Sequence, residues 1–278
     1  MKITGSLLKM KSEISQPIKY YLPIGSESVE MNSLINKPVK FTFENQIFCT
    51  NCGSKTYKSF HQGLCYPCFQ SSPLASECIL HPEKCQAHLG IGRDMEWEKK
   101  YHLTPQIVYL ALTANAKVGI TRKPQIPTRW IDQGAVQTII LAETPNRYLA
   151  GVIEVTLKEF IADKTHWQKM LKNEINTSVD LIALKQQMKS FLPSELKQYV
   201  VNDSQLLDLS YPVLEYPKKV KSMSFDKLSV VEGTLTGIKG QYLMFDYLNV
   251  LNIRKHQGYV VSIESVSYTH LRAHETSQ

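Results

Sequence analysis

Four cysteines in two closely spaced pairs are the residues of this chain whose spacing most clearly indicates a chemistry. Two residues separate Cys49 from Cys52 and Cys65 from Cys68, and twelve residues separate the pairs. Two such turns can bring four thiolates to the corners of a tetrahedron, the geometry that Zn²⁺ prefers. Gly53 follows the first pair, where a tight turn favours glycine. The spacing predicts a four-cysteine zinc site, with two disulfides or four unremarkable thiols as the alternatives.

The other two cysteines belong to a second candidate metal site just downstream. Cys78 and His81 are two residues apart, Cys85 and His88 repeat that spacing, and three residues lie between the halves. This pattern predicts a zinc site of two cysteines and two histidines. His61 is a competing ligand, and buried thiols beside surface histidines are the alternative.

The distribution of the cysteines indicates what the metal would do. All six lie between residues 49 and 85. This confinement favours a local metal module in a reducing cytoplasm over a disulfide scaffold. Four cysteines fill all four zinc positions and leave none for water or substrate, so the first site is predicted to be structural.

Composition limits the class of protein. The chain has 278 residues, 43% hydrophobic and 21% charged, values ordinary for a globular protein. No run of about 18 apolar residues and no signal peptide occurs, so no membrane span is expected. The formal net charge of +7 modestly favours polyanionic partners such as nucleic acid.

The pattern of elements predicts an α+β fold. Residues 1–48 and 200–265 resemble each other in their aromatic and β-branched strands, and we expect them to join in one β-rich body. Residues 49–104 form the expected zinc module and residues 105–199 an α/β module with following helices. Residues 266–278 resemble translated sequencing-adapter sequence, and we expect this tail to be non-native.

The central module presents groups suited to phosphodiester cleavage. Its predicted order is strand, strand, helix, strand, helix, with Tyr109 and Gly119 on the two strands, Arg129 on the first helix and Glu154 on the second. A carboxylate could hold a divalent cation, and a guanidinium could balance charge on phosphorus. The phenol could take a proton from the attacking water.

The segments VYLAL and KVGITR, together with Arg129 and Glu154, resemble the GIY-YIG nuclease superfamily over residues 105–170. The resemblance implies a role for Tyr109 near the nucleophile, for Arg129 at the phosphate, and for Glu154 as a ligand of Mg²⁺ or Mn²⁺. Lys117 stands where the second motif has its tyrosine. The longer span from CYPCF to ETPNRYLAGVIE resembles an uncharacterised bacterial domain family that combines zinc and hairpin elements.

Each of these residues also has a simpler interpretation. Tyr109 in an apolar strand is often just a packed aromatic, and Arg129 could stack on Trp130. Glu154 could form a structural ion pair with Arg122 or Arg129. Arg122 and Lys158 are candidate substrate-binding residues, although Lys158 also fits a solvated helix face.

Two functions therefore fit the sequence. One is a divalent-metal-dependent endonuclease, a hydrolase of the GIY-YIG type. The other is a non-catalytic zinc-containing module that binds nucleic acid or protein on a degenerate nuclease-like fold. They differ in whether Tyr109, Arg129 and Glu154 converge on a single open cleft. The choice among DNA, RNA and protein partners and the oligomeric state stay open.

Overall fold

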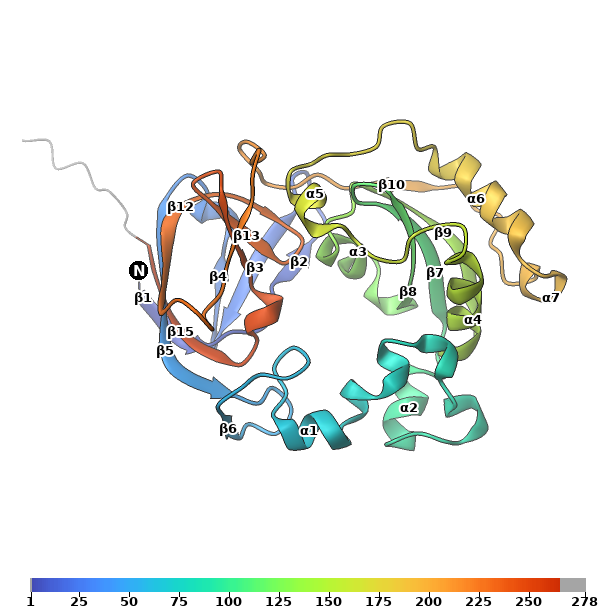
Figure 1. Ribbon diagram of the computed structural model, residues 1–278, viewed down its shortest axis with the longest axis horizontal. Coiled ribbons are helices and arrows are strands. Elements are labelled where there is room, and N and C mark those ends of the chain that lie inside the picture. Colours follow the sequence, from blue (N-terminus) through green and yellow to red (C-terminus); the bar gives the residue numbers. More distant parts are fainter. Residues whose placement is uncertain (1, 266–278) are drawn as a thin grey trace, which may run out of the picture.

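The computed structural model describes residues 2–265, so the predicted non-native tail at 266–278 lies outside the described residues. A β-rich body, drawn at the left of Figure 1, faces a second unit of sheet and helices at the right, and the cysteine-bearing segment joins them below. The predicted α+β class is confirmed. None of the helices within residues 2–265 has the length and apolarity needed to span a bilayer.

The body is built on an eight-stranded sheet to which both ends of the described chain contribute. Its order is β1-β15-β5-β12-β13-β14-β11, with β6 paired to β5. All pairs are antiparallel except β11 with β14. The strands are β1 (Lys2–Ser6), β5 (Pro38–Phe48), β6 (Lys55–Thr56), β11 (Lys221–Met223), β12 (Val230–Lys239), β13 (Tyr242–Phe245), β14 (Asn249–Asn252) and β15 (Tyr259–Ser265).

A smaller antiparallel sheet completes the body. It runs in the order β2-β3-β4, with β2 at Lys11–Glu13, β3 at Lys19–Ile24 and β4 at Glu27–Glu30. The apolar side chains of β3 are buried in the same core as Phe41 of β5 and Phe245 of β13. The two sheets therefore share one hydrophobic core, which supplies the main stabilisation of the body.

The second unit contains a four-stranded antiparallel sheet of order β10-β9-β7-β8. The strands are β7 (Gln106–Leu112), β8 (Ala116–Arg122), β9 (Gln137–Thr144) and β10 (Leu206–Asp208). The chain order β7, β8, α3, β9, α4 is the predicted order of the module. Strand β10 lies beyond residue 199, so this sheet extends past the boundary expected for the module.

Strand β7 is buried on both faces because each face packs on a different core. Ile107, Tyr109 and Ala111 point toward the core of the β-rich body. Val108, Leu110 and Leu112 alternate with them and pack against helices α4 and α6. Successive side chains of a strand point to opposite faces, so a continuous apolar run fits a strand covered on both sides. Tyr109 therefore belongs to the interface between the body and the module.

Short helices connect and cover these sheets. Helix α4 follows β9 and packs on the module's sheet, with Asn146 as its N-cap accepting a hydrogen bond from the Leu149 amide at 3.0 Å. The α-helices are α1 (Tyr66–Ser71), α2 (Met95–Tyr101), α3 (Thr128–Asp132), α4 (Arg147–Leu157), α5 (Trp167–Leu171), α6 (Leu181–Phe191) and α7 (Ser194–Lys197). The 3₁₀ helices are η1 (Asn32–Leu34), η2 (Pro73–Ala75), η3 (Glu77–Ile79), η4 (Pro82–Lys84), η5 (Ala87–Leu89), η6 (Lys123–Gln125) and η7 (Arg254–His256).

Candidate metal clusters and cavity

The first cysteine cluster forms where the long strand β5 meets helix α1. Cys49 follows β5, and Gly53 adopts a φ of 73°, which closes the turn of the first pair. Cys65 is the N-cap residue of α1, and Cys68 lies in its first turn. Backbone and side-chain donors point at sulfur, including the Cys65 amide to Cys49 Sγ at 3.2 Å and Asn51 Nδ2 to Cys68 Sγ at 3.3 Å.

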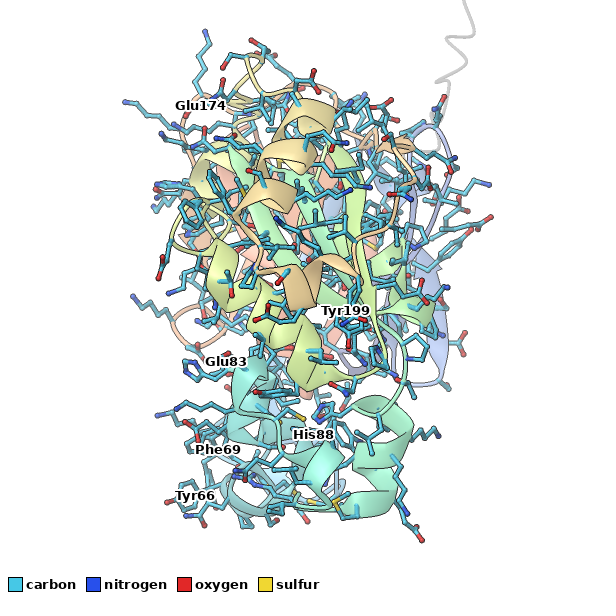
Figure 2. The ribbon with its side chains drawn as sticks, turned by 90° about the vertical axis from the view of Figure 1, so that its right-hand side faces the viewer. Tyr66, Phe69, Glu83, His88, Glu174 and Tyr199 are labelled. Atoms are coloured by element: carbon cyan, nitrogen blue, oxygen red, sulfur yellow. The ribbon has the colours of Figure 1, made fainter. Side chains whose placement is uncertain are left out.

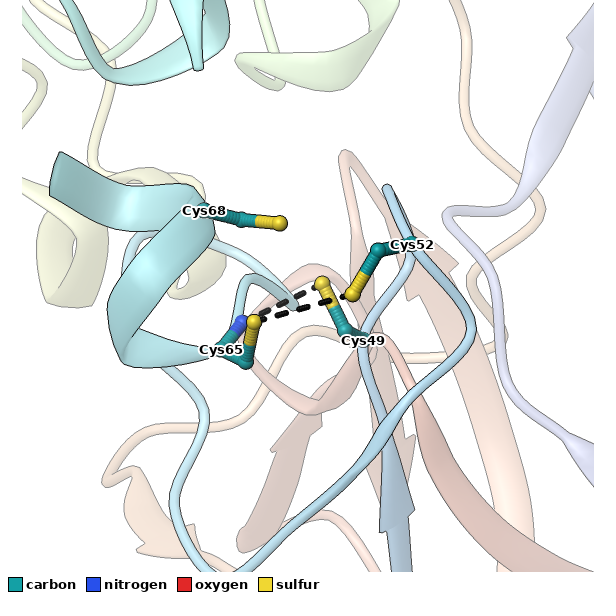
Figure 3. A group of neighbouring side chains, drawn as sticks. All are labelled: Cys49, Cys52, Cys65 and Cys68. Atoms are coloured by element: carbon teal, nitrogen blue, oxygen red, sulfur yellow. Dashed lines mark hydrogen bonds between the residues drawn. The ribbon is translucent and has the colours of Figure 1, made fainter. Parts of the chain in front are cut away.

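The spacing of the sulfurs fits a zinc ion. All four Sγ atoms lie within 4.8 Å of one another, and the four cysteines are free thiols (Figure 3). The Sγ atoms of Cys52 and Cys65 are 3.7 Å apart. Four sulfurs at the usual Zn–S bond length of about 2.3 Å would be separated by about 3.8 Å in a tetrahedron. This cluster could hold a structural zinc ion, as the spacing predicted.

Hydrogen bonds favour the thiolate form at one of these positions. Hydrogen bonds from the Ser54 side chain and backbone lower the pKa of Cys52 to about 6. Thiolates are the form that binds metal, so Cys52 is prepared for a cation. The two turns that carry the cysteines are also closely packed, since a Cβ added at Gly63 would lie 2.5 Å from the Thr50 side chain.

The second cluster brings together different candidate ligands from those that the spacing predicted. Cys78 and Cys85 converge with Glu98 and His102, whose ligand atoms all lie within 4.8 Å. Glu98 lies in the first turn of helix α2, and His102 is the residue that follows the helix. The expected partners, His81 and His88, lie outside this group, so the structure does not bring the predicted two cysteines and two histidines together and places Glu98 and His102 beside the cysteines instead.

The three histidines considered as ligands, His61, His81 and His88, have other surroundings. The side chain of His81 is 53% exposed, with Nδ1 3.5 Å from Glu83 Oε1. His88 is exposed and stacks on Tyr148 at a centroid distance of 4.5 Å. Figure 2 shows Glu83 and His88 in the cyan segment below helix α4. His61 lies outside both clusters and lines the cavity described next.

A cavity of about 800 Å³ lies where the cysteine-bearing segment (residues 49–104), the module and the body meet. Thr50 and His61 line it from the segment that carries the first cluster, His102 lines it from the second cluster, and Arg254 lines it from η7 of the body. Arg254 Nε also donates to Gln62 Oε1 at 2.7 Å, and this hydrogen bond connects the body to the cysteine-bearing segment. Six basic side chains line this cavity against two carboxylates, Glu154 and Asp163; the basic ones are Lys117, Arg122, Arg129, Arg147, Lys164 and Arg254.

Three of the four predicted catalytic residues line this one cavity. Lys117 reaches it from β8, Arg129 from α3 and Glu154 from α4. Arg122 lines it as well, with its guanidinium 4.5 Å from the ring centroid of Tyr101. Arg147, at the start of α4, is a lining residue that the sequence analysis did not single out, although it lies within the segment ETPNRYLAGVIE.

Tyr109 is the exception among the predicted catalytic residues. Its side chain is fully buried, and its hydroxyl donates to Gln133 Oε1 at 2.9 Å. The hydroxyl also lies directly behind Gly119, where an added Cβ would be 2.7 Å from it. Burial raises the pKa of Tyr109, so the phenol stays protonated. The structure therefore shows the packed aromatic that was the simpler interpretation of this residue.

Burial also shifts the pKa values of Lys117 and Glu154 in the cavity wall. The pKa of Lys117 is lowered to about 8 by burial and by the charge of Arg129, and its Nζ donates to Thr165 Oγ1 at 3.2 Å. Burial raises the pKa of Glu154. Both shifts follow from removing a charged group from water.

The ion pairs differ from those expected for Glu154. Lys158 Nζ lies 3.9 Å from Glu154 Oε2 and 3.2 Å from Asp163 Oδ2. Among the ion pairs of the described residues, Glu154 is matched with Lys158 and not with Arg122 or Arg129. Lys158 is paired with these two carboxylates and is not one of the lining residues of the cavity.

Comparison with known proteins gives one match. No curated protein and no solved structure matches the chain significantly, so the resemblance to GIY-YIG nucleases gains no support from these comparisons. The sequence profile of an uncharacterised domain family matches most of the chain, in line with the expected family membership. Residues 36–261 match the family described as Protein of unknown function (DUF2797), and the chain belongs to that family.

Proposed function

We propose that the cavity binds the phosphodiester backbone of a nucleic acid and hydrolyses it with a divalent cation held at Glu154. The observation that carries this proposal is the convergence of Lys117, Arg129 and Glu154 on one cavity from three different elements. A strand, a short helix and a long helix have to pack together for these side chains to meet. The antiparallel order β8-β7-β9, with α3 and α4 following the strands, is consistent with the resemblance that predicted the roles.

The charge of the cavity supports a polyanionic substrate. Its six basic lining residues outnumber its two carboxylates, and the whole chain carries a formal charge of +7. Phosphate oxygens are the groups that arginine recognises best, because the planar guanidinium donates in a fork. A cavity with Arg122, Arg129, Arg147 and Arg254 on its walls suits a chain of phosphates better than a neutral small molecule.

In this proposal the charge of each side chain determines its role. Arg129 stabilises negative charge that develops on the phosphate oxygens, and the Lys117 ammonium adds a second positive charge. Glu154 is largely buried yet lines the cavity, with a lysine as its nearest ion-pair partner, and this donor fits a hard cation. Mg²⁺ or Mn²⁺ bound there would supply Lewis-acid polarisation of the phosphate. Tyr109 positions Gln133 and supports Gly119, and does not act as a base.

A binding module without catalysis is the second candidate function. It is favoured by one observation: the phenol of Tyr109 is sealed behind Gly119, and the second motif has Lys117 in place of its tyrosine. Neither phenol of the GIY-YIG pattern is then available as a proton acceptor. The same basic cavity would still bind phosphates.

Cleavage of labelled DNA and RNA separates the two candidates. Purified full-length protein is incubated with single- and double-stranded substrates, with Mg²⁺, Mn²⁺ or EDTA, beside Glu154→Gln. We expect metal-dependent cleavage that falls by about 100-fold or more in Glu154→Gln, the cost of removing one electrostatic contributor. Binding, measured in parallel at low salt, is expected to persist in this variant.

Glu143→Gln is the matched control. Glu143 lies on β9 and pairs with Lys123 at 2.9 Å, away from the cavity, so its replacement should leave cleavage unchanged. Equal cleavage by Glu154→Gln and wild type would remove Glu154 from the proposed role. Salt-sensitive binding without cleavage in any metal would establish the module instead, and absence of binding at low salt would contradict both.

A further inference from the structure

The cluster of Cys78, Cys85, Glu98 and His102 is a closed set of metal donors. Cys78 Sγ lies 3.8 Å from His102 Nδ1, and Cys85 Sγ lies 3.7 Å from the same nitrogen. Zinc bonds of about 2.3 Å to sulfur and 2.0 Å to nitrogen would separate these atoms by about 3.5 Å in a tetrahedron. Both sulfur-to-nitrogen distances are therefore close to those expected for ligands of one zinc ion, and the ligand atoms of all four residues lie within 4.8 Å of one another.

Burial makes this arrangement costly without a cation. The exposed fraction of Cys78 is 8%, and it is 2% for each of Cys85, Glu98 and His102. Glu98 Oε2 lies against His102 Nδ1, and no other group among the described residues gives that oxygen a hydrogen bond. An ionised carboxylate taken out of water needs a positive partner. Two thiol groups converging on the same point add donors that prefer a soft or borderline metal.

We propose that Cys78, Cys85, Glu98 and His102 bind a second zinc ion, in a structural site distinct from the four-cysteine cluster. Two thiolates, one imidazole and one carboxylate are all ligands that zinc accepts, and four of them complete its tetrahedral coordination. The site comes from two segments: 3₁₀ turns η3 to η4 supply the cysteines, and helix α2 with its following residue supplies the other two ligands. This inference does not depend on the proposed nuclease activity.

The second site also explains how the cavity wall is fixed. Arg147 at the start of α4 donates from Nε to the Cys78 carbonyl at 2.9 Å and from Nη2 to the Ile79 carbonyl at 3.0 Å. Its backbone amide donates to the His102 carbonyl at 2.8 Å. The backbone of Pro82 and Glu83 packs directly on Gly151 in the same helix. A metal that orders both ligand segments therefore also orders α4, the helix that carries Glu154.

Metal stoichiometry tests the proposal on the full-length protein. Native mass spectrometry after chelator-free purification with zinc is expected to show two zinc ions per chain. Cys85→Ser and His102→Ala should each hold one, and Cys65→Ser should also hold one by losing the first site. His81→Ala and His88→Ala are matched controls that should keep both ions, because neither imidazole reaches the cluster.

Two further measurements test the second zinc site without relying on a cysteine variant that folds. Cobalt titration of wild-type protein should reach two equivalents, the two steps differing in sulfur-to-cobalt absorption because the sites have four and two thiolates. Glu98→Gln should weaken one of the two sites by about tenfold or more in a chelator competition. A wild-type stoichiometry of one, or two zinc ions retained in both Glu98→Gln and His102→Ala at unchanged affinity, would overturn the proposal.

Discussion

The two cysteine clusters lie in one segment of about 50 residues, yet they are built in different ways. In the first, each pair occupies a single turn, and all four ligands come from the CxxC spacings. In the second, the two cysteines lie in or next to 3₁₀ turns, and the other two members of the cluster are Glu98 of helix α2 and His102 directly after that helix. A ligand set held in local turns can be recognised from spacing, whereas one that depends on packing between segments cannot.

The difference has a physical cause in the turn between Cys78 and Cys85. Pro82 begins the 3₁₀ helix η4 and packs on helix α4, which leaves the preceding His81 facing solvent. His88 lies on the outer side of η5 against Tyr148. Docking of this segment to α4 therefore leaves both histidines outside the cluster, and helix α2 and the residue after it bring Glu98 and His102 to the cysteines.

Removal of the first cluster is the change with the largest expected effect. Cys65→Ser should lose one zinc ion and the order of residues 49–68, because structural zinc supplies roughly 10 kcal/mol or more to a small module. Limited proteolysis with peptide mapping measures this as new cleavage within the segment. Cys85→Ser is the paired variant and should leave residues 49–68 protected. Retained protection in Cys65→Ser would show that packing alone holds the first cluster.

Gly151→Ala tests how the second cluster depends on packing. A Cβ at this position would overlap the Glu83 amide nitrogen and the Pro82 carbonyl carbon. Both contacts are with backbone, so η4 and α4 have to separate, at a cost of about 1–3 kcal/mol. Urea unfolding should show that loss, and chelator competition should show weaker binding of one zinc ion only. Unchanged metal affinity would mean that the second cluster forms without its docking to α4.

Gly53→Ala is the corresponding change at the first cluster and should cost less. Apart from Gly53 and its two chain neighbours, no residue within 2–265 has an atom within 4 Å of the position of the added Cβ, so the cost comes from the left-handed backbone at φ 73°. We expect a loss of about 1–2 kcal/mol in urea unfolding, with zinc content unchanged. A loss larger than that of Gly151→Ala would reverse the contrast between a locally built and a packed cluster.

His88→Ala should have the smallest effect. It removes one stacked contact with Tyr148, an interaction of about 0.5–1.5 kcal/mol, and leaves both metal clusters complete. Thermal unfolding and zinc content measured on the same sample check this. Loss of a zinc ion would restore His88 to the ligand set that its spacing first indicated.

The fold and the cavity show the same difference between features that depend on nearby residues and features that depend on packing between distant segments. The order of strands and helices around residues 105–157 follows from hydrophobic periodicity, and Lys117, Arg129 and Glu154, which the sequence analysis singled out, all line the cavity. The sequence already offered a packed aromatic as the simpler interpretation of Tyr109, and the structure adds the physical cause, which is the packing of the body against one face of β7. Arg147 and Arg254 reach the cavity only through the docking of segments distant in sequence, and β10 joins its sheet in the same way.

Zinc K-edge X-ray absorption on the full-length protein tests the central claim, that both clusters are zinc centres with different ligands. Six sulfurs shared by two zinc ions give an average of three sulfurs and one nitrogen or oxygen per zinc. The account predicts this average in the wild type, and four sulfurs per zinc in His102→Ala. An average of four sulfurs in the wild-type protein would contradict it, because zinc would then occupy the first cluster alone.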